Sequence, residues 1–492
     1  MAKKQLTAEE YNAKLMNDKK CKWPLDKKYL DILKQYPLDQ AQDGVAFATN
    51  FSKHNAQLMI PFNFKCTEKL DFDLMRKAIA IEIERNDALC DRFYKDEKGN
   101  FSQYFVEPAD VHYEVSEVDY SSLTDEQQKK AIMKEANIDL QIFNGQFGRF
   151  VLYHANDGTD GILFFFNHFN VDGFGATVTI HDLFGVYMAL RDGTEMPKPL
   201  ASWRKVLEKQ IISEEEAQKN ADFYASELKK IDPFYRSDRF DARRSTNKKL
   251  LAIGKKKKLP SDMYGLLSLF HLKAGQDIFN IPADKVKEIG EFAQANGIPV
   301  PVIFYTAIRL YMAKLHNMRE YEMFNVYSNR RATKSEKNCG GSMQGVTYIV
   351  TKITPEMSER ECFAEVQDRL VTMYRYNNIS GKTATQLTDP LDWGEFTYYG
   401  SFDISFFSIP TELLEAVKGD FFYIYNGQLT CNDYCMLIPR RDGSLDFYFN
   451  YRTWHYDSEQ SALSFGGIME AINAMLSLGL DGTAAQIVDK IS

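Results

Sequence analysis

The sequence predicts an α+β protein built from two lobes. Helix-like and strand-like segments mix in both halves without a regular β–α–β alternation, and no Gly-rich dinucleotide loop is present. A length of 492 residues, at about 150 residues per domain, allows about three domains or two larger lobes. The hydrophobic share of 44% and the charged share of 26% are ordinary for a globular chain with a sizeable core.

The first lobe is predicted over 35–195, after a charged helical extension at 1–34. Asp71 can cap a helix on which Met75, Ile79 and Ile83 share one face. A stretch at 191–199 with one glycine and two prolines marks the lobe boundary. The other elements expected in this lobe are strands at 55–64, 102–106, 147–155 and 161–167, and a helix at 175–190.

The second lobe is predicted over 196–492 and repeats the mixture of elements. Its clearest strand is 445–453, where Leu445, Phe447, Phe449 and Tyr451 alternate onto one face. The other elements expected here are charged helix 214–230, helix 284–296 with Gly297 as its C-cap, helix 303–316 and helix 458–478.

Charge and composition exclude several classes of function. Lys and Arg total 60 against 68 for Asp and Glu, so the formal charge is −8, which argues against nucleic-acid or anionic-membrane binding. The basic run 255–258 is expected to be a solvated loop. Aromatic residues reach 13%, enough to line an apolar tunnel as well as to fill a core.

A cytoplasmic protein without a membrane span is expected. The chain has 7 cysteines, an odd number at low density, which fits a reducing compartment. The first residues are polar and lack the apolar region of a signal peptide. No apolar run approaches the roughly 18 to 20 residues that cross a bilayer.

The segment 164–175 carries the most chemical information. An aromatic strand ends at His168, and Asp172 and Gly173 follow just before a helix. A histidine at a strand end can act as a base near neutral pH, and glycine leaves room for close approach of a ligand. Spacing alone leaves the alternative open that His168 is a core residue and Asp172 only a helix cap.

The pattern His168-x-x-x-Asp172-Gly173 resembles the active-site signature of condensation-domain and chloramphenicol-acetyltransferase-like acyltransferases. Residues 36–44, including Gln42, and residues 85–93 resemble the first two motifs of nonribosomal peptide synthetase condensation domains. Further similar stretches lie at 328–330, 340–350 and 445–478, so that the resemblance covers about 35–490.

The resemblance implies two chloramphenicol-acetyltransferase-like lobes that form a V-shaped pseudo-dimer around a central tunnel. His168 would orient or deprotonate the acceptor, Gly173 would keep the tunnel open, and Asp172 would hold the motif through an arginine. Arg92 is the candidate partner of Asp172, with Arg85 and Arg330 as further candidates.

Two positions depart from the family pattern. Asn167 replaces the first of two adjacent histidines, although its amide can still form hydrogen bonds. Cys90 stands where many members carry arginine.

Further candidate groups lie outside this motif. The segment 399–406 resembles a serine-bearing strand that faces the histidine, so Ser401 and Ser405 are candidates for stabilising an oxyanion; a plain bridging strand is the alternative. Cys431 and Cys435 lack the partners of a zinc site, so no metal is expected. Neither a nucleophile elbow nor a phosphate-binding loop is present.

The leading hypothesis is a stand-alone condensation-type acyltransferase that forms an amide. The expected donor is a phosphopantetheine thioester on a separate carrier protein, or acyl-CoA, with no cofactor bound permanently; the acceptor is a small amine or alcohol. The alternatives are a CoA-dependent O-acyltransferase acting on a small alcohol or lipid, and a degenerate domain that binds a carrier or partner protein without catalysis.

Overall fold

The computed structural model describes residues 34–49, 56–95, 100–111, 113–140, 147–231, 273–329, 331–379, 403–407, 411–429, 433–453 and 456–492. The chain divides into two compact units. Unit 1 comprises Met1–Ile211, Arg331–Met343 and Val417–Asn426, and unit 2 comprises Ile212–Arg330, Gln344–Ala416 and Gly427–Ser492. Residues 196–211 and the segments 331–343 and 417–426 therefore group with the N-terminal part of the chain.

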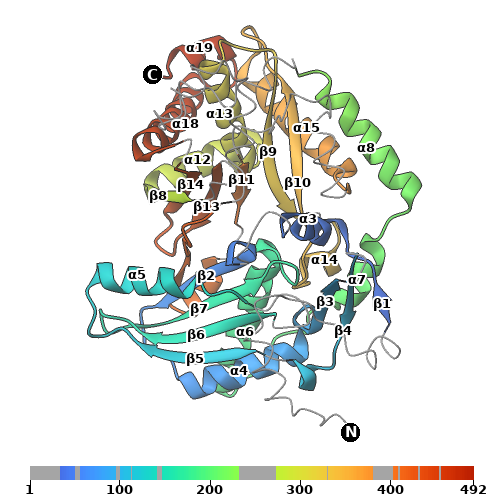
Figure 1. Ribbon diagram of the computed structural model, residues 1–492. Coiled ribbons are helices and arrows are strands. Elements are labelled where there is room, and N and C mark those ends of the chain that lie inside the picture. The colour runs from blue at the N-terminus through green and yellow to red at the C-terminus, as the bar shows by residue number, and fades with distance from the viewer. Residues whose placement is uncertain are drawn as a thin grey trace, which may run out of the picture. The chain divides into compact units, whose positions relative to one another are not determined.

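Unit 1 contains a five-stranded sheet in the order β12-β2-β7-β6-β5 (Figure 1). Its strands are β2 (Met59–Cys66), β5 (Glu114–Asp119), β6 (Gly148–His154), β7 (Asp160–Asn167) and β12 (Gly419–Tyr423). Neighbouring strands are antiparallel, except that β5 runs parallel to β6. All residues of β7 are buried, which explains its nearly continuous run of apolar side chains.

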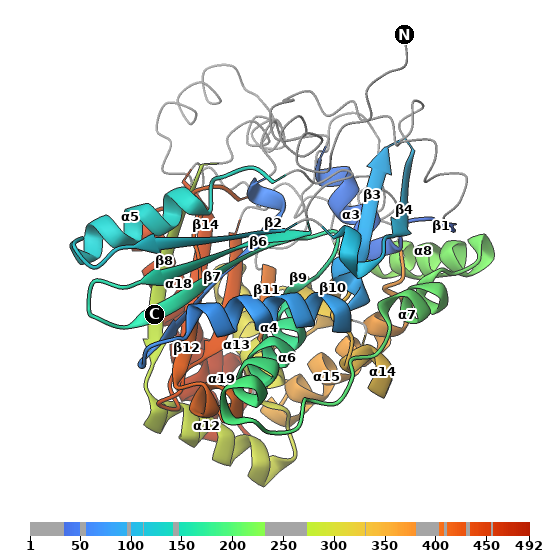
Figure 2. The same ribbon diagram turned by 90° about the horizontal axis from the view of Figure 1, so that it is seen from below.

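Helices cover both faces of this sheet (Figure 2). Helices α4 (Phe72–Arg85) and α6 (Gly173–Asp192) lie on one face, where the rings of Phe64 and Phe184 are 4.4 Å apart, and α5 (Asp125–Glu135) lies on the other. The predicted cap of α4 is confirmed, because the Asp71 side chain accepts a hydrogen bond from Leu74 N.

Unit 1 also contains a small sheet in the order β1-β4-β3 and several short helices. These elements are β1 (Gln35–Tyr36), α3 (Gln40–Ala48), β3 (Asp91–Lys95), β4 (Phe101–Phe105), α7 (Trp203–Gln210), α14 (Lys334–Lys337), and 3₁₀ turns at Ala56–Leu58, Asp87–Cys90 and Pro108–Asp110.

Unit 2 is built on a six-stranded sheet in the order β10-β9-β11-β13-β14-β8. The strands are β8 (Ala274–Ile281), β9 (Tyr321–Asn329), β10 (Gln344–Lys352), β11 (Asp403–Phe406), β13 (Asp433–Pro439) and β14 (Leu445–Arg452). β11 runs parallel to both of its neighbours, and the other pairs are antiparallel. The strand predicted at 445–453 is confirmed as β14, and both of its faces are buried.

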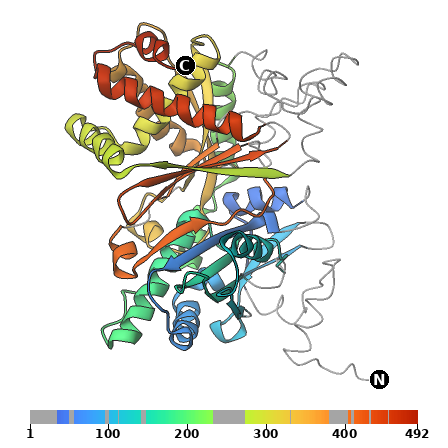
Figure 3. The same cartoon turned by 90° about the vertical axis from the view of Figure 1, so that its left-hand side faces the viewer.

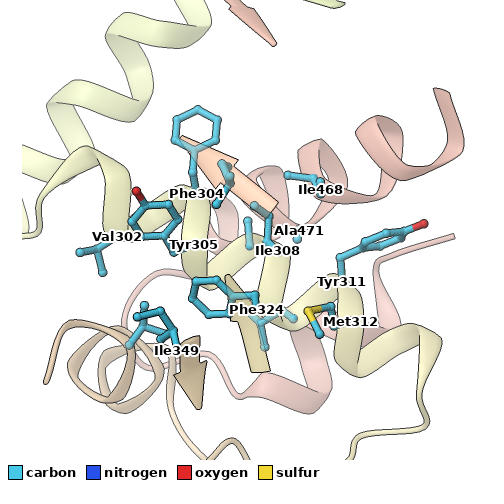
Figure 4. Close-up of a cluster of buried hydrophobic side chains, with 14 of the residues drawn as sticks. Val302, Phe304, Tyr305, Ile308, Tyr311, Met312, Phe324, Ile349, Ile468 and Ala471 are labelled. Carbon is cyan, nitrogen blue, oxygen red and sulfur yellow. The ribbon is translucent and has the colours of Figure 1, made fainter. Parts of the chain in front are cut away.

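The helices of unit 2 are α8 (Glu214–Leu228), α12 (Ala283–Asn296), α13 (Val300–Leu315), α15 (Glu359–Tyr376), α17 (Thr411–Ala416), α18 (Ser458–Leu478) and α19 (Ala484–Asp489). The residues of α13 from Val302 to Ala313 are all buried, and Figure 4 shows its side chains packed against those of Phe324, Ile349 and Ile468. Gly297 ends α12 with a φ of 65°, as predicted for a C-cap.

Helix α18 qualifies as a membrane span by length and composition alone, as does the pair α12–α13 if it is taken as one span bent by 103°. In unit 2, however, α18 lies on the same side of the sheet as α13 (Figure 3). Ile468, Ala471, Ile472 and Met475 are buried there in the core. This packing is what the apolar face of a core helix requires.

Candidate functional site

The predicted motif forms the turn between β7 and α6 in unit 1. β7 ends at Asn167, whose N–H donates to the Phe147 carbonyl at 2.7 Å. His168 follows, and its N–H donates to the Leu58 carbonyl at 3.0 Å. The histidine is therefore held at the end of a buried strand, as the sequence predicts.

The environment of His168 favours a neutral imidazole. Its Nδ1 is buried and forms no hydrogen bond with another residue in the described part of the chain, whereas the side chain as a whole is partly exposed. Burial lowers the pKa of His168, while the negative charge of Asp172 acts in the opposite direction. A neutral ring can accept a proton at neutral pH, which is what a general base must do.

The Asp172 side chain is completely buried and links the start of α6 to a distant segment of the chain. It caps α6, with its Oδ1 accepting from Gly175 N at 2.6 Å. Its Oδ2 accepts from Met343 N at 2.6 Å, and Oδ1 also pairs with Arg331 Nη2 at 3.1 Å. These charge-assisted bonds fix the start of α6 to the segment 331–343.

The prediction that Arg92 pairs with Asp172 is wrong. Arg92 is buried, but its Nη1 donates to the carbonyls of Leu89 at 3.1 Å and Asp91 at 2.8 Å. The Arg92 guanidinium therefore binds backbone carbonyls of its own turn. The arginine that pairs with Asp172 is Arg331.

The other two candidate partners of Asp172 are Arg85 and Arg330. Arg85 forms a bidentate pair with Asp182 on α6, at 2.7 and 3.0 Å, so it is not the partner of Asp172 either. Arg330 lies outside the described residues.

Glycine allows the segment 331–343 to approach α6 closely. A Cβ at Gly175 would lie 2.3 Å from the Gly340 carbonyl oxygen, and one at Gly341 would lie 2.1 Å from the Trp203 ring. Gly173, the first residue of α6, is partly buried. These contacts require glycine at Gly175 and at Gly341.

The two departures from the family pattern are both buried. Asn167 Oδ1 accepts from Phe169 N at 3.1 Å and so closes the turn, while its Nδ2 has no partner in the described part of the chain. Burial raises the pKa of the Cys90 thiol to about 12, so this side chain is neutral and carries no charge in place of arginine.

The remaining candidates lie in unit 2 or outside the described residues. Ser405 is nearly buried on β11 and accepts a hydrogen bond from the Tyr434 hydroxyl at 2.7 Å. Ser401 and Cys431 lie outside the described residues, and Cys435 is buried as a free thiol. No group of three or more His, Cys, Asp or Glu suited to a metal ion occurs among the residues that the structure describes.

Arg331 and Asn170 are site residues that the sequence analysis missed. Asn170 Nδ2 donates to the carbonyls of Ala88 and Asp91, at 2.9 and 2.8 Å, and so ties the turn after His168 to the start of β3. The only signal for Arg331 was its place directly after the candidate Arg330.

Comparison with known proteins identifies the family of this site. A family model described as "Condensation domain" matches residues 32–389. The chain belongs to the condensation-domain family. Members of this family transfer acyl or peptidyl groups.

Curated relatives of this condensation-domain protein are much longer than the chain. Surfactin synthase subunit 1 of Bacillus subtilis (strain 168) is 21% identical over an alignment of 448 residues that covers 86% of this chain and 11% of that protein. A probable non-canonical nonribosomal peptide synthetase, CymA, of Salinispora arenicola (strain CNS-205) is 27% identical over 157 residues, which are 32% of this chain and 2% of that protein. The chain thus spans about a tenth or less of these relatives.

Solved condensation domains share the fold. The first condensation domain of the calcium-dependent antibiotic synthetase, solved with a substrate analogue, has a TM-score of 0.70 at 13% identity and covers 92% of this chain and 98% of its own. A variant of the starter condensation domain of rhizomide synthetase, in complex with C8-CoA, has a TM-score of 0.70 at 13% identity and covers 94% and 98%. The predicted α+β, chloramphenicol-acetyltransferase-like fold is confirmed.

Proposed function

We propose that this condensation-domain protein transfers an acyl or aminoacyl group from a thioester to an amine and so forms an amide. The observation that carries the proposal is the position of His168 directly after β7, where burial lowers the pKa of its imidazole. The turn that follows it is locked by the buried pair of Asp172 and Arg331. A pre-positioned base beside a rigid turn suits attack by an amine on a carbonyl.

In the proposed step an amine displaces the thiol of the donor. The acceptor nitrogen attacks the thioester carbonyl carbon, and His168 takes the proton that the nitrogen loses. The C–N bond forms, the C–S bond breaks, and the leaving thiolate receives the proton from the imidazolium. Asp172 takes no part in this proton transfer, because Arg331 and two backbone N–H groups already bind its carboxylate.

Two donors are consistent with the comparisons. Surfactin synthase subunit 1 supports a phosphopantetheine thioester on a carrier protein, by analogy with peptide synthetases. The starter condensation domain solved with C8-CoA supports acyl-CoA. In both donors the reacting group is the same pantetheine thioester, so the chemistry at His168 is unchanged.

The proposal is tested with probes found in a related domain, C8-CoA and Leu-SNAC. The purified protein is incubated with Leu-SNAC and either C8-CoA or a carrier protein loaded with the same C8 group, and mass spectrometry follows the acylated leucine product. We expect His168→Ala to abolish product and His181→Ala, a change at an exposed position of α6, to retain it.

The other outcomes decide between the alternatives. Product formation that survives in His168→Ala contradicts the base role. Ester formed from alcohol acceptors, with no amide from any amine tried, identifies an O-acyltransferase. Binding of the loaded carrier without consumption of either donor identifies a domain that has lost catalysis, as Asn167 in the motif would then explain.

A further inference from the structure

The backbone of the catalytic loop, residues 168–172, is held from outside on more than one side. Asn170 ties it to the start of β3. On another side the carbonyl of Phe169, the residue directly after His168, accepts a hydrogen bond from Gln42 Nε2 at 3.2 Å. Gln42 lies on α3, and its side chain is completely buried.

The amide of Gln42 forms a reciprocal pair with a second buried amide, that of Gln103. Gln42 Nε2 donates to Gln103 Oε1 at 2.9 Å, and Gln103 Nε2 donates back to Gln42 Oε1 at 2.7 Å. Gln42 Oε1 also accepts from Asp39 N at 3.0 Å, and Gln103 Nε2 also donates to the Pro37 carbonyl at 2.8 Å. Both donors and both acceptor positions of the Gln42 amide are therefore used, so the amide cannot flip without losing bonds.

We infer that Gln42 is a positioning residue for His168, whereas Gln103 only completes the buried amide pair. The contact fixes the peptide group between Phe169 and Asn170, and through it the backbone torsions that aim the imidazole. The aromatic ring of Phe169 is held separately, at 4.9 Å from the ring of Phe93. Gln42 therefore fixes the main chain at Phe169, whereas the packing of the Phe169 ring fixes only its side chain.

The inference rests on the proposed function of His168 and is tested with two matched variants. Methionine has nearly the shape of glutamine and lacks its amide. Gln42→Met and Gln103→Met both break the reciprocal amide pair, but only Gln42→Met removes the hydrogen bond to Phe169. We expect Gln42→Met to lower kcat for C8 transfer about 10- to 100-fold with KM for the donor within about threefold, because small misplacement of a catalytic group is costly.

Gln103→Met serves as the control for loss of the buried pair. We expect its kcat to stay within about threefold of the parent, although its urea midpoint falls as much as that of Gln42→Met. An equal loss of kcat in both variants overturns the inference, because the amide pair then has only a structural role. Should Gln42→Met not fold, Gln42→Asn keeps an amide that is too short to reach Phe169, and the same pattern is expected.

A second readout does not depend on turnover. The imidazole signal of His168, assigned in NMR spectra by its loss in His168→Ala, is titrated in the parent and in both variants. We expect Gln42→Met to move the apparent pKa toward that of a solvated histidine and Gln103→Met to leave it unchanged. An unchanged titration in Gln42→Met overturns positioning, whereas a shift without any transfer activity in the parent overturns only the proposed function.

Discussion

Asp172 and Arg331 form an ion pair of 3.1 Å although 159 residues separate them in the chain. Both side chains are almost completely buried. The other hydrogen bonds of the guanidinium go to backbone carbonyls, those of Glu336 at 2.7 Å and Gly341 at 2.5 Å among them. Arg331 therefore stabilises the segment 331–343 and also holds this segment against the Asp172 carboxylate at the start of α6.

Replacing Arg331 is expected to destabilise the protein strongly. Arg331→Met removes one partner of a buried ion pair with Asp172, and such a loss costs about 3–5 kcal/mol. Urea unfolding followed by circular dichroism measures the change in the free energy of unfolding.

A pair of double-mutant cycles separates Arg331 from Arg92, the partner that the sequence analysis favoured. The cycle of Asp172→Asn with Arg331→Met should show coupling of more than about 1 kcal/mol, because the residues are in contact. The cycle with Arg92→Met should be additive within about 0.5 kcal/mol. Coupling to Arg92 as large as that to Arg331 would contradict the pairing in the structure.

The pH dependence of acyl transfer should reflect the burial of His168. Burial lowers the pKa of this histidine from its ordinary value of 6.5, and only the neutral ring can accept a proton. Values of kcat/KM measured between pH 5 and 8 should therefore fall on the acid side, with a midpoint below 6.5. A midpoint above 6.5 would mean that the ring is stabilised in its charged form instead.

Glu359, in the first turn of α15, should make the protein less stable as the pH rises. Its side chain is fully buried, and neither carboxylate oxygen has a hydrogen-bond partner in the described part of the chain. Burial raises the pKa of Glu359 to about 8 from an ordinary value of 4.5. Between these values the unfolded chain has released a proton that the folded chain retains, so the free energy of unfolding falls with rising pH.

The variant Glu359→Gln removes this titration. Its stability relative to the parent should increase steadily from pH 5 to pH 8, as measured by denaturant midpoints. Glu361→Gln is the matched control, because hydrogen bonds with Ser358 lower the pKa of Glu361 and this residue stays charged over the whole range. The difference between Glu361→Gln and the parent should be constant from pH 5 to 8, and a flat difference for Glu359→Gln as well would refute the assignment.

Two helix glycines should respond to alanine in opposite directions. In α6, a Cβ at Gly175 would clash with the carbonyls of Gly340 and Gly341, so Gly175→Ala should cost about 1–3 kcal/mol. In α12, nothing lies within 4 Å of a Cβ at Gly290, so Gly290→Ala should stabilise the protein by about 0.5–1 kcal/mol. Thermal unfolding of both variants tests this, and stabilisation by Gly175→Ala would show that the segment 331–343 is not packed there.

The sequence was sufficient to locate His168 at a strand end and Asp172 as the cap of α6, because both depend on local chemistry. An apolar run predicts the strand, and an aspartate before a helix predicts the cap. The arginine partner depended instead on which distant segment packs at the cap. Arg331 was not distinguishable from Arg330 or Arg92 by spacing, since only the folded chain brings its segment to α6.

For the same reason, the sequence does not indicate which sheet strand β12 joins. Its sequence, Gly419–Tyr423, has the aromatic character of a strand, but nothing in it indicates the sheet that it joins. In the structure it pairs with β2, through the register Phe421 opposite Phe64. The partner of such a strand depends on packing in the folded unit, which the strand's own sequence does not contain.

Strand β12 has a consequence for biosynthesis. Directly before β12, Lys418 forms an ion pair with Glu68, which lies 350 positions earlier in the chain. At about 5–20 residues per second, a ribosome needs roughly 20–70 s to make that interval. For all of that time β2 lacks its outer neighbour and offers an unpaired edge to other chains. The edge of β2 is therefore open to pairing with other chains until β12 has been translated.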